Sequence, residues 1–68
     1  MKYVGENIKA TRIAKSYSEA YMAFCLSISA AHYTRLENNP RKMTINRLAD
    51  IADILNVPLK ELLQRHDP

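Results

Sequence analysis

The apolar residues of this chain recur at intervals close to 3.6 residues, which is the spacing of one helix face, rather than alternating as in a β-strand. The clearest case is a stripe at i, i+3, i+4 and i+7, formed by Leu48, Ile51, Ala52 and Leu55. The first helix is expected from about Glu6. The whole pattern predicts an all-α fold of five short helices, with no strand.

Small polar residues and prolines mark the expected helix ends. Three residues are suited to cap the second, third and fourth helices: Ser18, Ser29 and Thr44. Pro40 forbids continuation of the third helix, so Asn38 or Asn39 is expected to take a left-handed cap. Asn56 should end the fourth helix, and Pro58 suits the first turn of a fifth.

Length and composition narrow the range of functions. The 68 residues are 47% hydrophobic and contain no repeat, low-complexity stretch or linker, so residues 1–68 are expected to form one domain with one modest core. Cys25 is the single cysteine, which excludes an internal disulfide, and we expect it to be buried or half-buried. Cys25, His32 and His66 lack a further ligand or an activating base at suitable spacing. We therefore expect no metal, no cofactor and no enzymatic activity.

The sequence also lacks the features of an exported or membrane protein. Its N-terminus has no apolar run of signal-peptide length. The longest stretch without a charged residue, Ala20 to Thr34, is fifteen residues long and contains serines and a histidine, so it is poorly suited to span a bilayer. We expect a soluble, cytoplasmic protein with no membrane partner.

Charge is distributed unevenly along the chain. The net charge is +3, but residues 1–47 contain eight Lys and Arg against three acidic residues, whereas residues 48–68 contain two against four. Such asymmetry suggests a polyanionic partner for the first two-thirds of the chain.

The connection between the second and third helices is short. Only Leu26, Ser27 and Ile28 separate them. A link of this length fits a helix-turn-helix. It fits an antiparallel helical hairpin equally well, so length alone does not decide.

Three segments bear a family resemblance: YS-x-x-x-MA-x-x-LSIS at 17–29, RLEN at 35–38 and ILNVPLKELL at 54–63. Together they resemble the small helix-turn-helix domain of phage repressors and Xre-type bacterial regulators, over roughly Ile8 to Leu63. The resemblance implies a repressor-like helix-turn-helix domain that binds double-stranded DNA. Residues 29–37 would then be the recognition helix, with its N-terminal residues facing the major groove and with Tyr33 and Leu36 turned toward the core.

The resemblance also implies roles for individual residues. The expected base contacts are Ala30, Ala31, His32, Thr34 and Arg35. The expected phosphate contacts are Ser18, Ser29, Arg41, Lys42 and Arg47. Family members often bury an ion pair beneath the DNA-binding face, which here would join Arg12 to Glu37.

The chain departs from the family pattern at five positions. Ala30 and Ala31 stand where many members have longer polar side chains, so fewer direct hydrogen bonds to bases are expected. Glu19 stands where a glutamine often steadies a phosphate, and a carboxylate there would repel phosphate. Ser27 and Asn39 stand where glycine is usual, so both positions are expected to need a positive φ.

Two apolar groups lie outside the expected core. Tyr21 and Phe24 flank the core face of the second helix, and we expect them to pack against the first helix or against Tyr3 and Val4; the alternative is a surface for a partner. At the other end, a dimer interface is expected at Ile54, Leu59 and Leu63. One recognition helix reads few bases, which favours a homodimer.

The sequence therefore predicts a sequence-specific transcriptional regulator, most simply a repressor, that binds a twofold-symmetric operator as a homodimer. One alternative is an antitoxin-type module whose main partner is another protein. Another is a restriction–modification controller, which activates as well as represses.

Overall fold

The computed structural model describes residues 2–65. This part of the chain forms five α-helices and one turn of 3₁₀-helix: α1 (Lys2–Ala14), α2 (Glu19–Leu26), α3 (Ala30–Asn38), η1 (Pro40–Lys42), α4 (Ile45–Leu55) and α5 (Leu59–Leu63). It contains no β-strand. The predicted all-α fold is confirmed.

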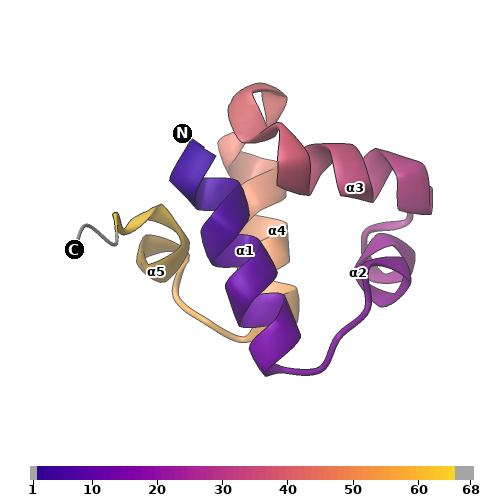
Figure 1. The fold of residues 1–68 in the computed structure, drawn as a ribbon, viewed down its shortest axis with the longest axis horizontal. Helices are drawn as coiled ribbons and strands as arrows, with labels where there is room; N and C mark the ends of the chain where they lie inside the picture. The colour runs from indigo at the N-terminus through magenta and orange to yellow at the C-terminus, as the bar shows by residue number, and fades with distance from the viewer. Residues whose placement is uncertain (1, 66–68) are drawn as a thin grey trace.

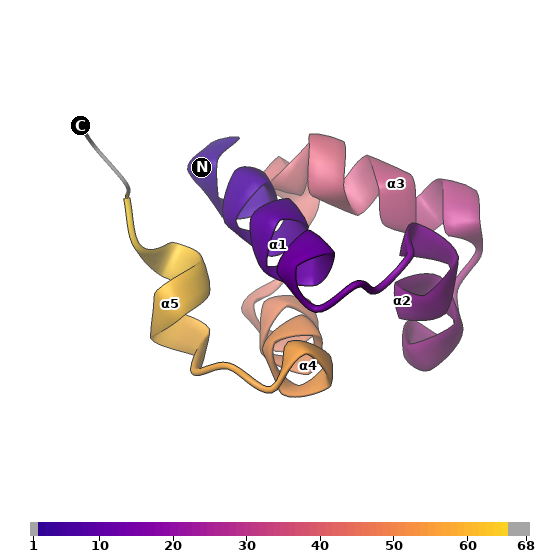
Figure 2. The same ribbon diagram turned by 60° about the horizontal axis from the view of Figure 1, so that its bottom comes forward.

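Helix α1 occupies the centre of the molecule and packs against α3, α4 and α5 (Figure 1). Helices α2 and α5 lie on opposite sides of it in both ribbon views (Figures 1 and 2). The core contains the predicted stripe of α4, as well as Ile8 from α1, Met22 from α2 and Tyr33 from α3. The stripe is buried because it faces α2, α5 and α1.

The three expected N-caps are present. The hydroxyls of Ser18, Ser29 and Thr44 each accept a hydrogen bond from the backbone N–H three residues later, at 3.0, 3.0 and 3.1 Å. Each bond satisfies one of the N–H groups that the first turn of a helix leaves without a partner. These caps fix the starts of α2, α3 and α4.

Helix α1 begins earlier than the sequence predicted, at Lys2 rather than near Glu6. The additional turn buries Val4, which is 1% exposed. It also brings Gly5 against the end of α3, where a Cβ on Gly5 would overlap the carbonyl oxygen of Glu37. The extra turn is therefore stabilised by tertiary packing rather than by a local capping signal.

The expected left-handed cap at the end of α3 is wrong for both asparagines. Asn38 is the last helical residue, and Asn39 has φ −141°. The residue before a proline is held in the extended region, and Asn39 precedes Pro40. Ser27, with φ 59°, does adopt the positive value expected for it, and Asn56 ends α4 with φ 57°. Pro58 is the N-cap residue of α5.

Candidate nucleic-acid interface

The link between α2 and α3 is a tight turn that sets two helices at a steep angle. Figure 1 shows α2 nearly end-on and α3 along its length. Ser27 makes the turn in the left-handed conformation, and its N–H donates to the carbonyls of Ala23 and Phe24. Ser29 then caps the start of α3. The steep crossing is that of a helix-turn-helix and not of an antiparallel hairpin.

Helix α3 has one buried and one exposed face. Tyr33, Leu36 and Glu37 are buried. The residues expected to contact bases lie on the other side: Ala30, Ala31, His32 and Arg35 are exposed, and Thr34 is half-buried. The small Ala30 and Ala31 leave the helix backbone accessible at its N-terminal end, as close approach to base edges requires.

A shallow hollow of about 350 Å³ brings together residues from two expected groups. Its lining includes His32 and Arg35, expected to contact bases, and Lys42 of η1, expected to contact phosphate. We call the hollow that these three residues line the basic hollow. Two amides, Asn38 and Asn39, and the apolar Leu36 also line it, so hydrogen-bond donors stand beside apolar surface there.

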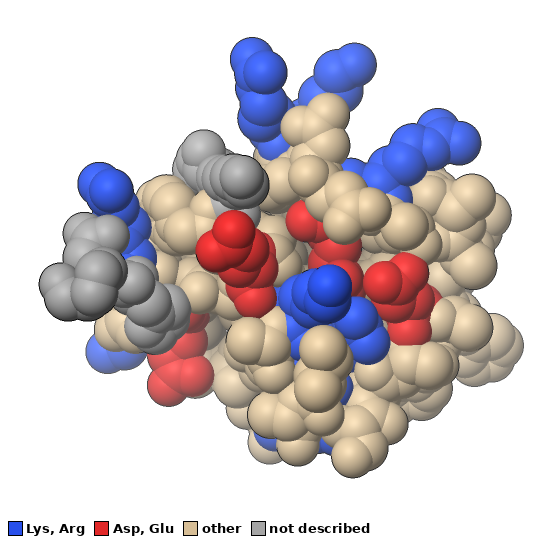
Figure 3. Space-filling view, in the orientation of Figure 1, with Lys and Arg blue, Asp and Glu red and all other residues tan. Residues whose placement is uncertain are grey.

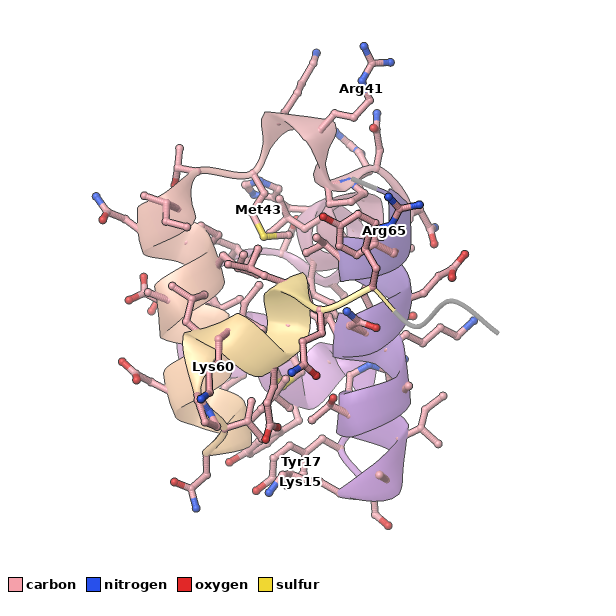
Figure 4. All side chains as sticks on the ribbon, turned by 90° about the vertical axis from the view of Figure 1, so that its left-hand side faces the viewer. Lys15, Tyr17, Arg41, Met43, Lys60 and Arg65 are labelled. Carbon is pink, nitrogen blue, oxygen red and sulfur yellow. The ribbon has the colours of Figure 1, made fainter. Side chains whose placement is uncertain are left out.

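The neighbouring surface is also basic. Arg41 extends from η1 away from the helices, whereas Met43, the residue after η1, points toward their interior (Figure 4). Basic side chains project from the edge of the molecule formed by the end of α3 and the turn after it, while acidic groups lie lower on the same face (Figure 3). The single 3₁₀ turn thus places two cations, Arg41 and Lys42, directly after α3.

Arg47 is not part of this arrangement. It is half-buried on α4 and lines a separate hollow of about 290 Å³ between α2 and α4. Asp50 and Asp53 line the same hollow. Their charges oppose a phosphate there, so the local electrostatics around Arg47 differ from those at the basic hollow.

A buried polar network lies beneath α3. Arg12 Nε donates to Glu37 Oε2 at 2.7 Å, and Arg12 Nη2 donates to Glu37 Oε1 at 3.3 Å. The hydroxyl of Tyr33 donates to the same Oε2 at 2.6 Å, and Arg12 Nη1 donates to the carbonyl of Tyr17 at 2.8 Å. The network therefore ties α1 to α3 and to the loop before α2.

The ionisation of this network follows from its contacts. Hydrogen bonding to Glu37 raises the pKa of Arg12 above its ordinary value, and the charge of Glu37 adds to the effect. Burial raises the pKa of the Tyr33 hydroxyl, and its hydrogen bond to Glu37 raises that pKa further. Tyr33 is therefore a neutral donor, and Arg12 is the cation that balances the buried carboxylate.

Glu19, the first residue of α2, is turned toward α3. Its Oε1 accepts a hydrogen bond of 2.6 Å from the Thr34 hydroxyl, and its Oε2 lies 3.6 Å from Arg12 Nη2. Thr34 Oγ1 also lies 3.0 Å from the carbonyl oxygen of Ala30. The hydroxyl of Thr34 therefore already has partners within the protein.

Two expectations for α2 are wrong. Phe24 is 82% exposed and packs against neither α1 nor Val4, and Cys25 is exposed rather than buried. Tyr21 is 44% exposed and rests on Tyr17, with ring centroids 4.7 Å apart. An eight-residue helix with neighbours on only part of its circumference cannot bury every large side chain.

The residues expected at a dimer interface lie at the margin of the core. Ile54, Leu59 and Leu63 are each partly buried and pack against it. Two further apolar residues, Ile13 and Ile45, are more exposed, at 56% and 59%. Their positions at the end of α1 and the start of α4 carried no sequence signal that distinguished them from core residues.

The described part of the chain has neither a cluster of metal ligands nor a membrane-spanning helix. Within residues 2–65, no group of three or more His, Cys, Asp or Glu could hold a metal ion. His66 lies outside the described residues. Over the same range, no helix has the length and apolar character needed to cross a membrane.

Comparison with known proteins agrees with this geometry. A helix-turn-helix family model matches residues 8–62, which is well over half of the chain. The comparisons with curated proteins and with solved structures gave no match. The matched segment extends from the second half of α1 into α5 and includes both helices of the motif. The chain therefore belongs to the Xre-type helix-turn-helix family of DNA-binding regulatory domains.

Proposed function

We propose that this protein is a sequence-specific transcriptional regulator, most simply a repressor, that acts by occupying an operator. The observation that supports the proposal is the basic hollow, which is lined both by His32 and Arg35 of the exposed face of α3 and by Lys42. Donors that can reach base edges thus lie beside a cation that can hold the DNA backbone. Specific DNA-binding surfaces combine these two kinds of contact.

The proposed base contacts centre on Arg35. Its guanidinium can donate two parallel hydrogen bonds to O6 and N7 of a guanine. His32 lies one turn earlier on the same face, and the methyl groups of Ala30 and Ala31 suit contact with a thymine methyl. The hydroxyl of Thr34 donates to Glu19, so its proton is not free for a base edge.

The proposed phosphate contacts surround this face. The exposed Ser18 and Ser29 stand at the N-termini of α2 and α3, where backbone N–H groups favour an anion. Arg41 and Lys42 follow α3 directly. Arg47 is a weaker candidate than these four because two aspartates line its hollow.

We further propose that the protein acts as a homodimer through Ile54, Leu59 and Leu63. A twofold axis would place the two α3 helices in successive major grooves of one DNA face, about 34 Å apart. The partial exposure of all three residues leaves apolar surface available to a second copy.

The decisive experiment is selection of bound sites from random duplex DNA, followed by affinity measurements over a range of salt concentrations. We expect a twofold-symmetric consensus bound at least about 10³-fold more tightly than random DNA. Weak binding with a steep salt dependence and no consensus would indicate phosphate contact alone and would contradict the proposal.

Two substitutions separate the two kinds of contact. Arg35→Ala should weaken operator binding by about 1–3 kcal/mol and relax selection at one base pair. Lys42→Ala should weaken binding to all sequences alike and make the logarithmic salt slope shallower by about 0.9. Lys60→Ala on the distant α5 removes the same charge and is the matched control, with no expected effect.

A second candidate is an antitoxin-type module, favoured by the exposure of Phe24. An 82% exposed phenylalanine beside an exposed tyrosine is unusual on a surface without a partner. A protein that co-purifies stably with the chain, and is released by Phe24→Ser, would support this reading.

Whether the protein activates as well as represses transcription would follow from the position of the selected operator relative to the promoter.

A further inference from the structure

The polar contacts between α2 and α3 assign a role to Glu19 that differs from a phosphate contact. We propose that Glu19 is a positioning residue, which holds the recognition helix in place through Thr34 and in doing so reduces attraction to the DNA backbone. The proposal rests on the proposed function, because it concerns how the same surface chooses between operator and random DNA.

The geometry of the contact is that of a strong hydrogen bond. Thr34 Oγ1 lies 2.6 Å from Glu19 Oε1, a distance typical of a hydroxyl bound to an ionised carboxylate. Thr34 is near the middle of α3, and Glu19 is the first residue of α2. The bond therefore restrains the rotation of α3 about its axis relative to α2, and the direction of the neighbouring Arg35 depends on that rotation.

The contact also defines what Thr34 can do. A hydroxyl has one proton, and the two acceptors near Thr34 are Glu19 Oε1 and the carbonyl of Ala30. With the proton directed to Glu19, Thr34 has no donor left for a base edge. Thr34 therefore acts chiefly through Glu19, and for a base it retains only an acceptor lone pair and its methyl group.

The balance of charges around Arg12 explains why Glu19 would reduce attraction to the DNA backbone. Arg12 is held by two carboxylates: its Nη2 lies 3.3 Å from Glu37 Oε1 and 3.6 Å from Glu19 Oε2. One cation between two anions leaves a net charge of −1. The Glu37 side chain is 3% exposed whereas that of Glu19 is 38% exposed, so the excess charge reaches solvent beside Ser18. A negative charge at that helix start opposes the phosphate contact proposed there.

The test compares variants on two duplexes of equal length, the selected operator and a random sequence. Glu19→Gln keeps an acceptor for Thr34 but removes the charge. We expect both duplexes to bind about fivefold more tightly at 0.15 M salt, with a logarithmic salt slope steeper by up to about 0.9. The preference for the operator should stay unchanged, because the hydrogen bond to α3 remains.

Two further variants isolate the positioning role. Glu19→Ala should tighten binding to random DNA to a similar extent but lower the operator preference by up to about tenfold, the size of one hydrogen bond. Thr34→Val should lower that preference equally without altering affinity for random DNA. It should also leave the selected consensus unchanged at every base pair. Helical circular dichroism checks that each variant is folded.

Glu61→Gln is the matched control for overall charge. Glu61 is exposed on α5, on the opposite side of α1 from α2 (Figures 1 and 2), so its substitution should change neither binding constant. Equal effects of Glu61→Gln and Glu19→Gln would overturn the proposed charge effect.

Three other results would also overturn the inference. Loss of operator preference in Glu19→Gln as large as in Glu19→Ala would show that the hydrogen bond does not position α3. A changed base in the consensus of Thr34→Val would show that Thr34 reads DNA. Failure of the wild-type protein to bind any DNA would refute the proposed function itself, whereas normal wild-type binding with inert Glu19 variants refutes this inference alone.

Discussion

Glu37 is a buried carboxylate with every contact provided by the protein. It accepts hydrogen bonds from Arg12 Nε, Arg12 Nη2 and the Tyr33 hydroxyl, and its side chain is 3% exposed. Such a group is stable as an anion only while these donors remain. The cost of removing one partner is therefore larger than the net contribution of the pair.

Replacement of either member of this pair should destabilise the fold. We expect Glu37→Ala or Arg12→Ala to lower the free energy of unfolding by about 3–5 kcal/mol, because each leaves an uncompensated buried charge or donor. Urea denaturation followed by circular dichroism measures the change. Lys9→Ala, exposed on the same helix as Arg12, is the control and should cost less than about 0.5 kcal/mol. A near-neutral Glu37→Ala would contradict the account.

The Tyr33 hydroxyl should make stability depend on alkaline pH. Its pKa is raised in the folded protein by burial and by Glu37, relative to an ordinary value of 10.0. Above that value the unfolded chain releases a proton that the folded chain retains, so the stabilisation is complete below about pH 10 and is lost as pH rises further.

The comparison with Tyr33→Phe isolates this effect. The wild-type free energy of unfolding should fall more steeply than that of Tyr33→Phe between about pH 10 and pH 11.5, because the other titrating groups are the same in both proteins. Denaturation curves at several pH values provide the measurement. Parallel pH profiles would show that Tyr33 ionises equally easily in both states.

At the scale of elements, the turns after α1, α2 and α4 depend on non-glycine residues with positive φ. These residues are Ser16, Ser27 and Asn56, with φ of 61°, 59° and 57°. The left-handed conformation is unfavourable for an L-residue such as serine but is tolerated by asparagine. The helix-turn-helix turn therefore contains strain at Ser27.

Relief of that strain should stabilise the protein. We expect Ser27→Gly to raise the free energy of unfolding by about 0.5–1 kcal/mol. Glycine relieves the strain of the left-handed conformation, and the greater freedom that it gives the unfolded chain offsets part of this gain. Thermal and urea denaturation measure it. Asn56→Gly is the comparison and should gain less, since asparagine already accepts this conformation. A loss of stability in Ser27→Gly would mean that the serine side chain contributes more than the strain costs.

At the scale of the whole molecule, apolar surface is exposed in more than one place. Phe24 and Tyr21 lie on α2, whereas the proposed dimer residues lie on α4 and α5. Helix α5 is on the opposite side of α1 from α2 (Figure 2). Two separate surfaces can thus serve two partners, a second copy and a different protein.

The proposed dimer surface can be tested against the other surface. Leu63→Asp should lower the fraction of dimer in sedimentation experiments and weaken operator binding at least about tenfold, since one half-site alone is a poor target. Phe24→Asp places the same charge on α2 and should leave the dimer unchanged. Dissociation by Phe24→Asp instead would assign the interface to α2.

The sequence predicted most of the architecture because its signals are local. Periodic apolar residues and the caps Ser18, Ser29 and Thr44 depend on neighbours within one or two helical turns. The prediction of a left-handed cap at Asn39 failed for a reason that is also local. The restriction that Pro40 imposes on the preceding residue outweighs the tolerance of asparagine for that conformation. The early start of α1 was not predictable in this way, because Val4 is buried by distant helices.

The sequence by itself determined the number and order of the helices, the buried stripe of α4 and the exposed face of α3. Only the tertiary structure decided that Glu19 of α2 meets both Thr34 of α3 and Arg12 of α1. It also left Phe24 exposed, where the sequence favoured packing. The reason is physical. Helical spacing fixes the direction in which a side chain points from the helix axis. The residue that it contacts is set by the packing of segments far apart in the chain.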